Sequence, residues 1–210
     1  MINLDDLINK ITCADCMYIL KKLPDKCIDL VLTDPPYGII KEMSLRTTKN
    51  IGKAEKWDIR PNKEYFDEIF RISKNQIIWG YQYFISNFSE GKGIIFWDKK
   101  NGDNFMSDGE LAFNSCTNAV RIYRYAKIGK DNYEPTRIHP TQKPLKLFEW
   151  CICKFTNEND LVLDCFSGSG TTAIACHRLK RRFICIEKDP EYWEASCKRL
   201  EDEQRQGVLL

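Results

Sequence analysis

The fold is decided by the stretch Leu161-Val162-Leu163-Asp164-Cys165-Phe166-Ser167-Gly168-Ser169-Gly170-Thr171-Thr172. Its apolar start predicts a buried strand, and the acidic residue and glycines that follow predict a turn into a helix. Glycines let the backbone pass close to a ligand, and free N–H groups at a helix start favour an anionic group. A strand, a glycine turn and a helix in this order are typical of nucleotide-binding α/β folds.

The spacing of the glycines narrows the class of ligand. The turn lacks both the Gly-x-Gly-x-x-Gly of dinucleotide enzymes and the lysine of a P-loop. A second predicted strand, Phe183 to Ile186, ends in Glu187, where acidic side chains of such folds accept hydrogen bonds from ribose hydroxyls. These residues favour a ligand that carries a ribose and needs no phosphate clamp; a structural turn with an exposed glutamate is the alternative.

The rest of the chain alternates between strand and helix patterns. Strands are predicted at Ile28 to Thr33, Gln76 to Trp79, Gly93 to Trp97, Leu161 to Leu163 and Arg182 to Ile186. Helices are predicted at Met17 to Leu23, Lys63 to Ser73, Pro144 to Phe155, Thr171 to Leu179 and Pro190 to Glu203. This alternation predicts an α/β fold with a doubly wound, mainly parallel sheet, helices on both faces and ligands at the carboxyl ends of the strands.

The composition indicates the number of domains and the cellular location of the protein. The 210 residues, 43% of them hydrophobic, suffice for one complete core, so we expect a single domain over residues 1–210. A net charge of +2 neither demands nor excludes a nucleic-acid partner. Ten cysteines without a signal-peptide pattern or a membrane-length apolar run indicate a reducing intracellular location. Cys13 and Cys16 lack a second ligand pair, so we predict no metal.

A second motif, Asp34-Pro35-Pro36-Tyr37, closes an otherwise apolar predicted strand. The two prolines fix φ and remove two backbone donors, so the turn is rigid and its carbonyl oxygens stay available as acceptors. A carboxylate and carbonyl oxygens that face one point suit an amino group, and the tyrosine offers a flat stacking surface. Such a turn fits a base that has been flipped out of a nucleic acid, and a proline-rich turn without a ligand is the alternative.

The two motifs together carry a family resemblance that covers nearly the whole chain. The chain resembles the DNA amino-methyltransferases, in which Asp-Pro-Pro-Tyr and Phe-x-Gly-x-Gly motifs share one doubly wound sheet. The catalytic motif precedes the cofactor motif, which is the circularly permuted order of the β group of bacterial and phage enzymes. The resemblance implies a Rossmann-like fold that uses S-adenosyl-L-methionine, a cytoplasmic location and a role in DNA methylation, as in restriction-modification. It divides the chain into a catalytic half (1–126), a short basic segment (127–138) and a cofactor-binding half (139–210).

The resemblance also implies roles for single residues. The segment His139-Pro140-Thr141-Gln142-Lys143-Pro144 matches the same group, where it helps hold the methionine end of the cofactor. Asp15 would follow a strand and contact the adenine of the cofactor, or cap the helix from Met17, and both roles are compatible. The expected catalytic residues are Asp34, Pro35, Pro36 and Tyr37; the expected cofactor-binding residues are Asp15, Asp34, Lys143, Pro144, Asp164, Phe166, Ser167, Gly168, Gly170, Thr171 and Glu187.

The proposed chemistry follows from the weak nucleophilicity of a base amino group. Asp34 and the carbonyl of Pro35 would accept its two hydrogens and favour a tetrahedral nitrogen, while Tyr37 stacks on the base. Asp at the first motif position favours N6 of adenine, whereas Ser-Pro-Pro-Tyr is typical of cytosine N4 enzymes. Cytosine N4, RNA, a protein glutamine and a non-catalytic, cofactor-binding subunit of a heteromeric enzyme remain as alternatives.

Two basic segments are the expected contacts to DNA. These segments, Ile39 to Arg60 and Tyr123 to Arg137, are long, polar and close to the two motifs. The alternative for each is a solvated surface loop without a partner. The candidate nucleic-acid contacts are Arg46, Lys49, Lys53, Lys56, Trp57 and Arg124. The second segment is short for a target-recognition region, so the recognition sequence stays open, as does the help of a second copy or a partner specificity subunit.

Overall fold

A single eight-stranded sheet organises the chain in a computed structural model that describes residues 3–39, 58–102, 107–126 and 138–207. The strands lie in the order β1-β8-β7-β2-β3-β5-β4-β6. They comprise β1 (Lys10–Cys13), β2 (Ile28–Thr33), β3 (Ser73–Trp79), β4 (Gly93–Asp98), β5 (Gly109–Asn114), β6 (Val120–Arg124), β7 (Leu161–Asp164) and β8 (Arg182–Glu187). All five predicted strands are present, which confirms the alternation of strands and helices.

Most neighbouring strands run parallel, as predicted. The pairs β1 and β8, β8 and β7, β7 and β2, β2 and β3, and β4 and β6 are parallel. Only β5 runs against its neighbours, β3 and β4, among the described strands. Because β5 is reversed, its first residues lie at the edge where the other strands end.

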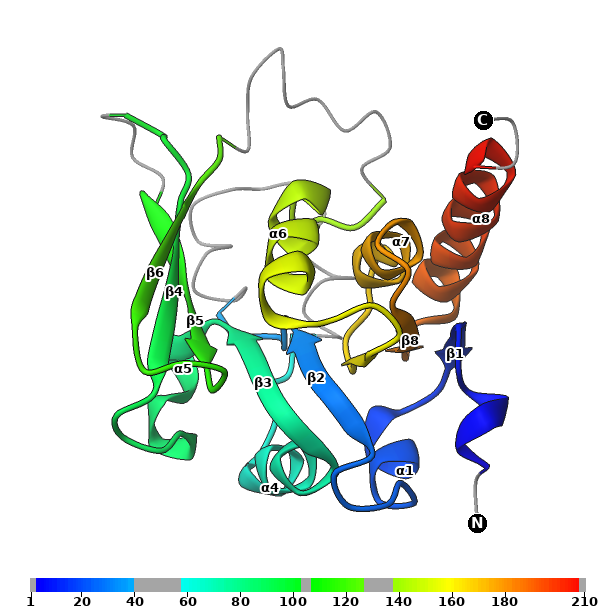
Figure 1. Cartoon of the computed structure of the whole chain (residues 1–210), viewed down its shortest axis with the longest axis horizontal. Helices are drawn as coiled ribbons and strands as arrows, with labels where there is room; N and C mark the ends of the chain where they lie inside the picture. Colours follow the sequence, from blue (N-terminus) through cyan, green and yellow to red (C-terminus); the bar gives the residue numbers. More distant parts are fainter. Residues whose placement is uncertain (1–2, 40–57, 103–106, 127–137, 208–210) are drawn as a thin grey trace.

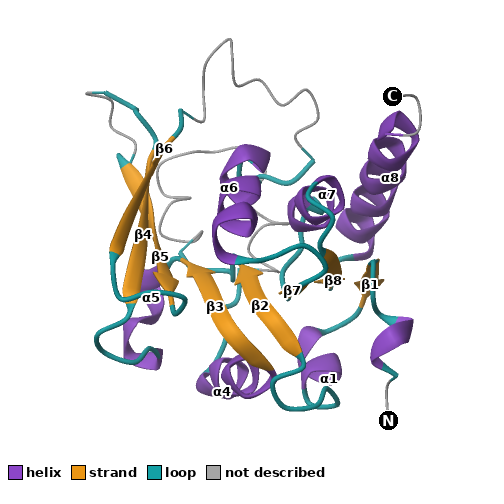
Figure 2. Ribbon diagram, viewed as in Figure 1, coloured by secondary structure: helices purple, strands orange, loops and turns teal. Residues whose placement is uncertain are grey.

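Helices cover both faces of the sheet, as Figures 1 and 2 show. The longer helices are α4 (Lys63–Ile72), α6 (Leu145–Phe155), α7 (Thr171–Arg178) and α8 (Pro190–Gly207), and the short ones are α1 (Cys16–Leu20) and α5 (Tyr81–Phe84). Two apolar clusters fill the interfaces: one packs α6, α7 and α8 against one face, and the other packs α1, α4 and α5 against the opposite face. None of the helices in the described ranges is long and apolar enough to cross a membrane.

The structure corrects several expectations at the ends of elements. Residues Val120–Arg124 form β6, so the segment expected as a loop from Tyr123 begins after Arg124 instead. Strand β6 lies at the sheet edge and is largely exposed, so it lacks the apolar run that reveals a buried strand. Helix α1 ends at Leu20 rather than at Leu23, because the chain tightens there into turns in which Lys22 bonds to Ile19 and Leu23 bonds to Leu20.

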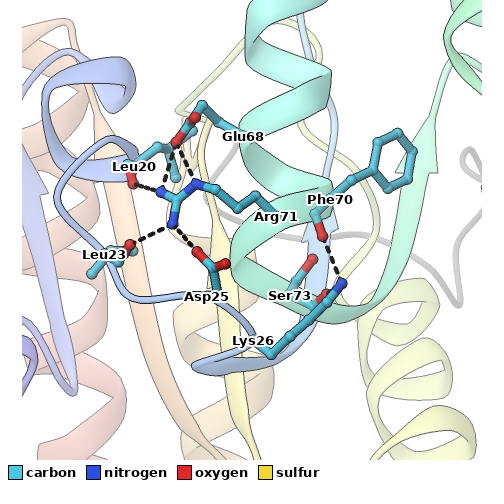
Figure 3. Close-up of polar contacts among 8 residues, drawn as sticks. All are labelled: Leu20, Leu23, Asp25, Lys26, Glu68, Phe70, Arg71 and Ser73. Atoms are coloured by element: carbon cyan, nitrogen blue, oxygen red, sulfur yellow. Dashed lines mark hydrogen bonds and ion pairs between the residues drawn. The ribbon is translucent and has the colours of Figure 1, made fainter.

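Arg71 of α4 ties the end of α1 to the neighbouring turn (Figure 3). Its guanidinium donates to the carbonyl oxygens of Leu20 and Leu23, each at 2.9 Å, and pairs with Asp25 at 2.6 Å and Glu68 at 2.7 Å. Carbonyl groups at a helix end have no partner within the helix, so a cationic donor there satisfies and stabilises them. The network fixes the chain just before β2, the strand that leads to Asp34.

We expect Arg71→Ala to lower the free energy of unfolding by about 2 kcal/mol, because two carbonyls and two carboxylates lose a charged donor. Urea denaturation measures this change. Arg205→Ala is the control, since Arg205 pairs with Glu201 and Asp202 only on the exposed face of α8 and its loss should cost under about 0.5 kcal/mol. Equal losses in the two variants would contradict this role of Arg71.

Candidate active site

The chemistry-bearing side chains gather at the carboxyl edge of the sheet. Asp34 follows the end of β2, Asp164 ends β7 and Glu187 ends β8, while Glu110 comes to the same edge from the start of the reversed β5. Thr33 of β2 lies beside Ile78 of β3, so the Asp34-to-Tyr37 turn is adjacent to the residues that follow β3. The structure therefore unites the two motifs, which are about 130 residues apart in the sequence.

Asp34 lies in a buried network of charges. Tyr37 donates its hydroxyl hydrogen to Oδ1 of Asp34, and the Lys143 ammonium lies 2.5 Å from Oδ2. The same ammonium is 2.9 Å from Oε2 of Glu110, whose other oxygen lies 2.7 Å from Nζ of Lys99. Only 6% of the Lys143 side chain and 16% of the Asp34 side chain are exposed. Two carboxylates and two ammonium groups thus balance one another with little access to water.

Burial and charge set the protonation of this network. Burial raises the pKa of Asp34, and the neighbouring Glu110 adds to this effect against the opposing Lys143. Burial would also raise the pKa of Glu110, but Lys143 and Lys99 together lower it to about 2. Burial opposes the charge of Lys143, yet Asp34 and Glu110 raise the pKa of Lys143 to about 12. Lys143 and Glu110 are therefore charged at neutral pH, whereas the pKa of Asp34 is raised above its ordinary value.

The ring of Tyr37 is held by packing on the residues after β3. It stacks on Tyr83 with ring centroids 4.7 Å apart and an interplanar angle of 22°, and its edge faces Phe84 at 6.1 Å. Gly80 has a φ of +77°, and a Cβ at this position would lie 2.2 Å from Cε1 of Tyr37. Only glycine therefore lets the backbone pass this close to the ring. The Arg60 side chain adds a hydrogen bond of 3.0 Å to the carbonyl of Tyr37.

Asp164 links β2, the strand that leads to Asp34, to the glycine turn. It is almost completely buried and accepts hydrogen bonds from Thr33 Oγ1 at 2.9 Å, Thr172 Oγ1 at 2.5 Å and the backbone N–H of Phe166 at 3.1 Å. Its contacts join β2, β7 and α7, so they fix the two motifs relative to each other. Burial raises the pKa of Asp164 to about 6.

This raised pKa makes stability depend on pH. The folded chain holds the Asp164 proton more tightly than the unfolded chain, whose pKa is near 3.8, so stability is lost as pH rises from about 4 through 6. The full effect is about 3 kcal/mol. We expect Asp164→Asn to lack this dependence, so its stability relative to the unchanged chain should improve over that window in urea denaturation. Parallel pH curves for the two proteins would contradict the raised pKa.

The glycine turn and Glu187 form a site that fits a ribose-bearing ligand. The N–H of Gly168 donates to Oε2 of Glu187 at 2.7 Å, and the N–H of Asp189 donates to Oε1 at 2.8 Å. Each carboxylate oxygen keeps a second lone pair that can accept a ribose hydroxyl. The ring of His139 lies beside Gly168, and Gly170, at φ +74°, allows the helix α8 residue Ser196 to approach closely. Burial raises the pKa of Glu187.

Most of the other expected cofactor residues lie around this turn. Asp34 and Lys143 lie in the network at the end of β2 instead, and Pro144 directly follows Lys143. Asp15 follows β1 and caps α1 by accepting from the N–H of Met17 at 3.0 Å, while Lys188 pairs with it at 2.8 Å. Phe166 packs on Tyr65, Ser167 donates its N–H to Ile186, Thr171 begins α7, and the buried Pro144 is the N-cap of α6. Asp34 and Lys143 lie apart from the turn because the Lys143 ammonium pairs with Asp34 and with Glu110.

The candidate DNA contacts are mostly beyond the described part of the chain. Arg46, Lys49, Lys53, Lys56 and Trp57 lie outside the described residues. Arg124 ends the edge strand β6, is largely exposed and lies 3.5 Å from Asp98. Three residues near the Asp34-to-Tyr37 turn were not predicted from the sequence as part of the site: Gly80, Tyr83 and Glu110. Only Glu110 left a signal, as a carboxylate directly before the apolar Leu111-Ala112-Phe113.

The chain is similar in sequence to known DNA methyltransferases. The family model described as DNA methylase, of the N6/N4 type, matches residues 60–198. The chain is 27% identical to the Type II methyltransferase M.HinfI of Haemophilus influenzae over 260 residues, covering 95% of this chain and 70% of that protein.

Two solved structures are also similar. The complex of M1.HpyAVI with S-adenosylmethionine has a TM-score of 0.61 and 27% identity, covering 91% of this chain and 98% of the other. The cytosine-N4-specific PvuII DNA methyltransferase has a TM-score of 0.62 at 18% identity, covering 94% and 91%. Because the fold extends to a cytosine-specific enzyme, fold likeness alone does not distinguish adenine from cytosine.

Proposed function

The chain belongs to the N6/N4 DNA methylase family, and from this premise we propose that it transfers a methyl group to N6 of adenine in DNA. The methyl donor of the family is S-adenosylmethionine, which supplies an electrophilic methyl group on a sulfonium sulfur. The observation that carries the proposal is the buried Asp34 carboxylate beside Tyr37, joined through Asp164 and Thr33 to the glycine turn.

The residues of the chain would hold the cofactor at the edge where β1, β7 and β8 end. Glu187 would accept the ribose hydroxyls and Asp15 would contact the adenine, while the turn around Gly168 leaves room for the backbone to approach the ligand. These residues suit S-adenosylmethionine, because that cofactor carries a ribose and no phosphate, and the glycine turn lacks the lysine of a phosphate-binding loop.

The catalytic turn would bind the target base. Tyr37 would stack on the extruded base with its other side supported by Tyr83, and Asp34 and the carbonyl of Pro35 would accept the two amino hydrogens. Holding the nitrogen in a tetrahedral geometry makes its lone pair available for attack, which is a positioning and electrostatic effect. The proposed work of these residues requires no metal and no covalent enzyme intermediate.

The proposal also covers the target base, the domain organisation, and the location and DNA contacts of the protein. The Asp at the first motif position favours adenine over cytosine, and cytosine N4 is the second candidate because the fold is shared with a cytosine-specific enzyme. The continuous sheet across both motifs supports one methyltransferase domain. We also propose a cytoplasmic location, because the DNA of a bacterial or phage-infected cell lies there, and DNA contacts through Arg124 and the basic residues near positions 46–57.

The test is transfer of labelled methyl from S-adenosylmethionine to unmodified DNA of mixed sequence, followed by analysis of the digested nucleosides. N6-methyladenine is the expected product. N4-methylcytosine would replace the adenine proposal by the second candidate. Absence of any labelled nucleoside, with cofactor binding confirmed by calorimetry, would overturn the proposal in favour of a cofactor-binding subunit that needs a partner, or of a substrate other than DNA.

A further inference from the structure

We propose that Glu110 is a positioning residue that holds the Lys143 ammonium when the target amino group takes the place of that ammonium at Asp34. Glu110 lies outside both motifs, on the reversed strand β5, and this inference rests on the proposed function. Its basis is the arrangement of Lys143 between two carboxylates, at 2.5 Å from Asp34 and 2.9 Å from Glu110.

Both oxygens of Asp34 already have donors in the structure. Oδ1 accepts from the Tyr37 hydroxyl, and Oδ2 accepts from Lys143. A base amino group that donates to this carboxylate must compete with one of these donors, and an ammonium in contact with a carboxylate is the stronger competitor. Methyl transfer therefore requires a second acceptor for the ammonium, within reach of its present position.

Glu110 is placed and charged for that task. Lys99 follows β4, and its Nζ lies 2.7 Å from Oε1 of Glu110. The other oxygen, Oε2, faces Lys143. The two lysines keep the pKa of Glu110 low, so it stays ionised inside the network. Because Lys143 is almost fully buried, loss of Glu110 would leave Asp34 as its one acidic partner among the described residues, and an unpaired buried ammonium is costly. The ammonium would then stay on Asp34.

The experiment compares Glu110→Gln with Glu149→Gln in the full chain. Glu149 of α6 is a matched control: its side chain is 14% exposed against 18% for Glu110, and it also lies between two cations, Lys146 and Arg178. For each variant we would measure kcat and KM for unmodified DNA, the Kd for S-adenosylmethionine and the thermal midpoint. We expect Glu110→Gln to lower kcat about tenfold or more, with Kd and thermal midpoint like those of Glu149→Gln.

The pH dependence of kcat separates positioning from a structural role. Among the described residues, the ionisable groups that interact with Asp34 are Lys143, Glu110, Asp164 and the Tyr37 hydroxyl, and Glu110 raises the pKa of Asp34. Removing the charge of Glu110 should therefore move the acid limb of the kcat profile to lower pH, which Glu149→Gln should not do. A kcat within twofold of the unchanged chain, or an unmoved acid limb, would overturn the inference.

If Glu110→Gln does not fold, the double variant Lys99→Gln, Glu110→Gln removes one charge of each sign and carries the same readouts. Loss of kcat with the shifted acid limb in that variant would support the inference, and retained kcat would overturn it. Methyl transfer by the unchanged chain shows whether a failure concerns this inference alone or the proposed function as well. If it transfers methyl groups but the variants do too, this inference alone fails, whereas no transfer by the unchanged chain would overturn the proposed function as well.

Discussion

Replacing Asp34 with alanine should lower kcat by about 10³-fold or more while the Kd for S-adenosylmethionine changes little. In the proposed function this carboxylate accepts a hydrogen of the target amino group, and the structure buries it beside Tyr37 at the end of β2. Lys143 retains Glu110 as a partner in this variant, so the buried ammonium is not left without a counter-charge. Single-turnover transfer of labelled methyl to DNA measures the chemical step directly.

Two further variants complete this test. Asp34→Asn keeps the size and one acceptor oxygen but removes the charge, so we expect it to be nearly as inactive as the alanine variant. Asp29→Asn is the control, because Asp29 belongs to the same strand and also pairs with a lysine, Lys74, at 2.7 Å. Substantial transfer by Asp34→Ala would refute the role of the carboxylate, whatever the behaviour of the control.

Replacing Gly80 with alanine should lower kcat by about 10²-fold, although Gly80 belongs to no motif. A Cβ there would lie 2.2 Å from the Tyr37 ring, so the ring must move away from its place beside Tyr83 and Asp34. A displacement of about 1 Å in a positioning group can cost this much in rate. Stopped-flow or quenched assays of methyl transfer measure the rate, and the change in DNA KM shows whether stacking on the base is also weakened.

Gly91→Ala separates the displaced ring from backbone strain. Gly91 has nearly the same φ, +73° against +77°, but no described atom lies within 4 Å of its Cβ position. Both variants should lose about 1 kcal/mol of stability from the left-handed conformation, yet only Gly80→Ala should lose rate. Equal rates for the two variants would contradict the proposed dependence on the position of Tyr37.

Much of the fold follows from local sequence. The helix Lys63–Ile72 and the strand Ile28–Thr33 appear within one residue of their predicted bounds, because amphipathic spacing and apolar runs encode them directly. The strands β5 and β6 were not predicted, and β1 was expected only through the family resemblance, as the strand before Asp15. Strand β5 begins with a glycine and a glutamate, and β6 is an exposed edge, so neither has the apolar run of a buried strand.

The family resemblance, the two motifs and their order could be read from the sequence, because rigid proline and glycine turns need particular residues at fixed spacing. The surroundings of the Asp34 carboxylate, in contrast, depend on the tertiary fold. Glu110, Gly80 and Tyr83 reach Asp34 and Tyr37 because the reversed strand β5 begins at the edge of the sheet where β2 and β3 end. Lys143, too, meets Asp34 across 109 positions of sequence, since contacts between distant segments depend on how strands pair, which no local pattern encodes.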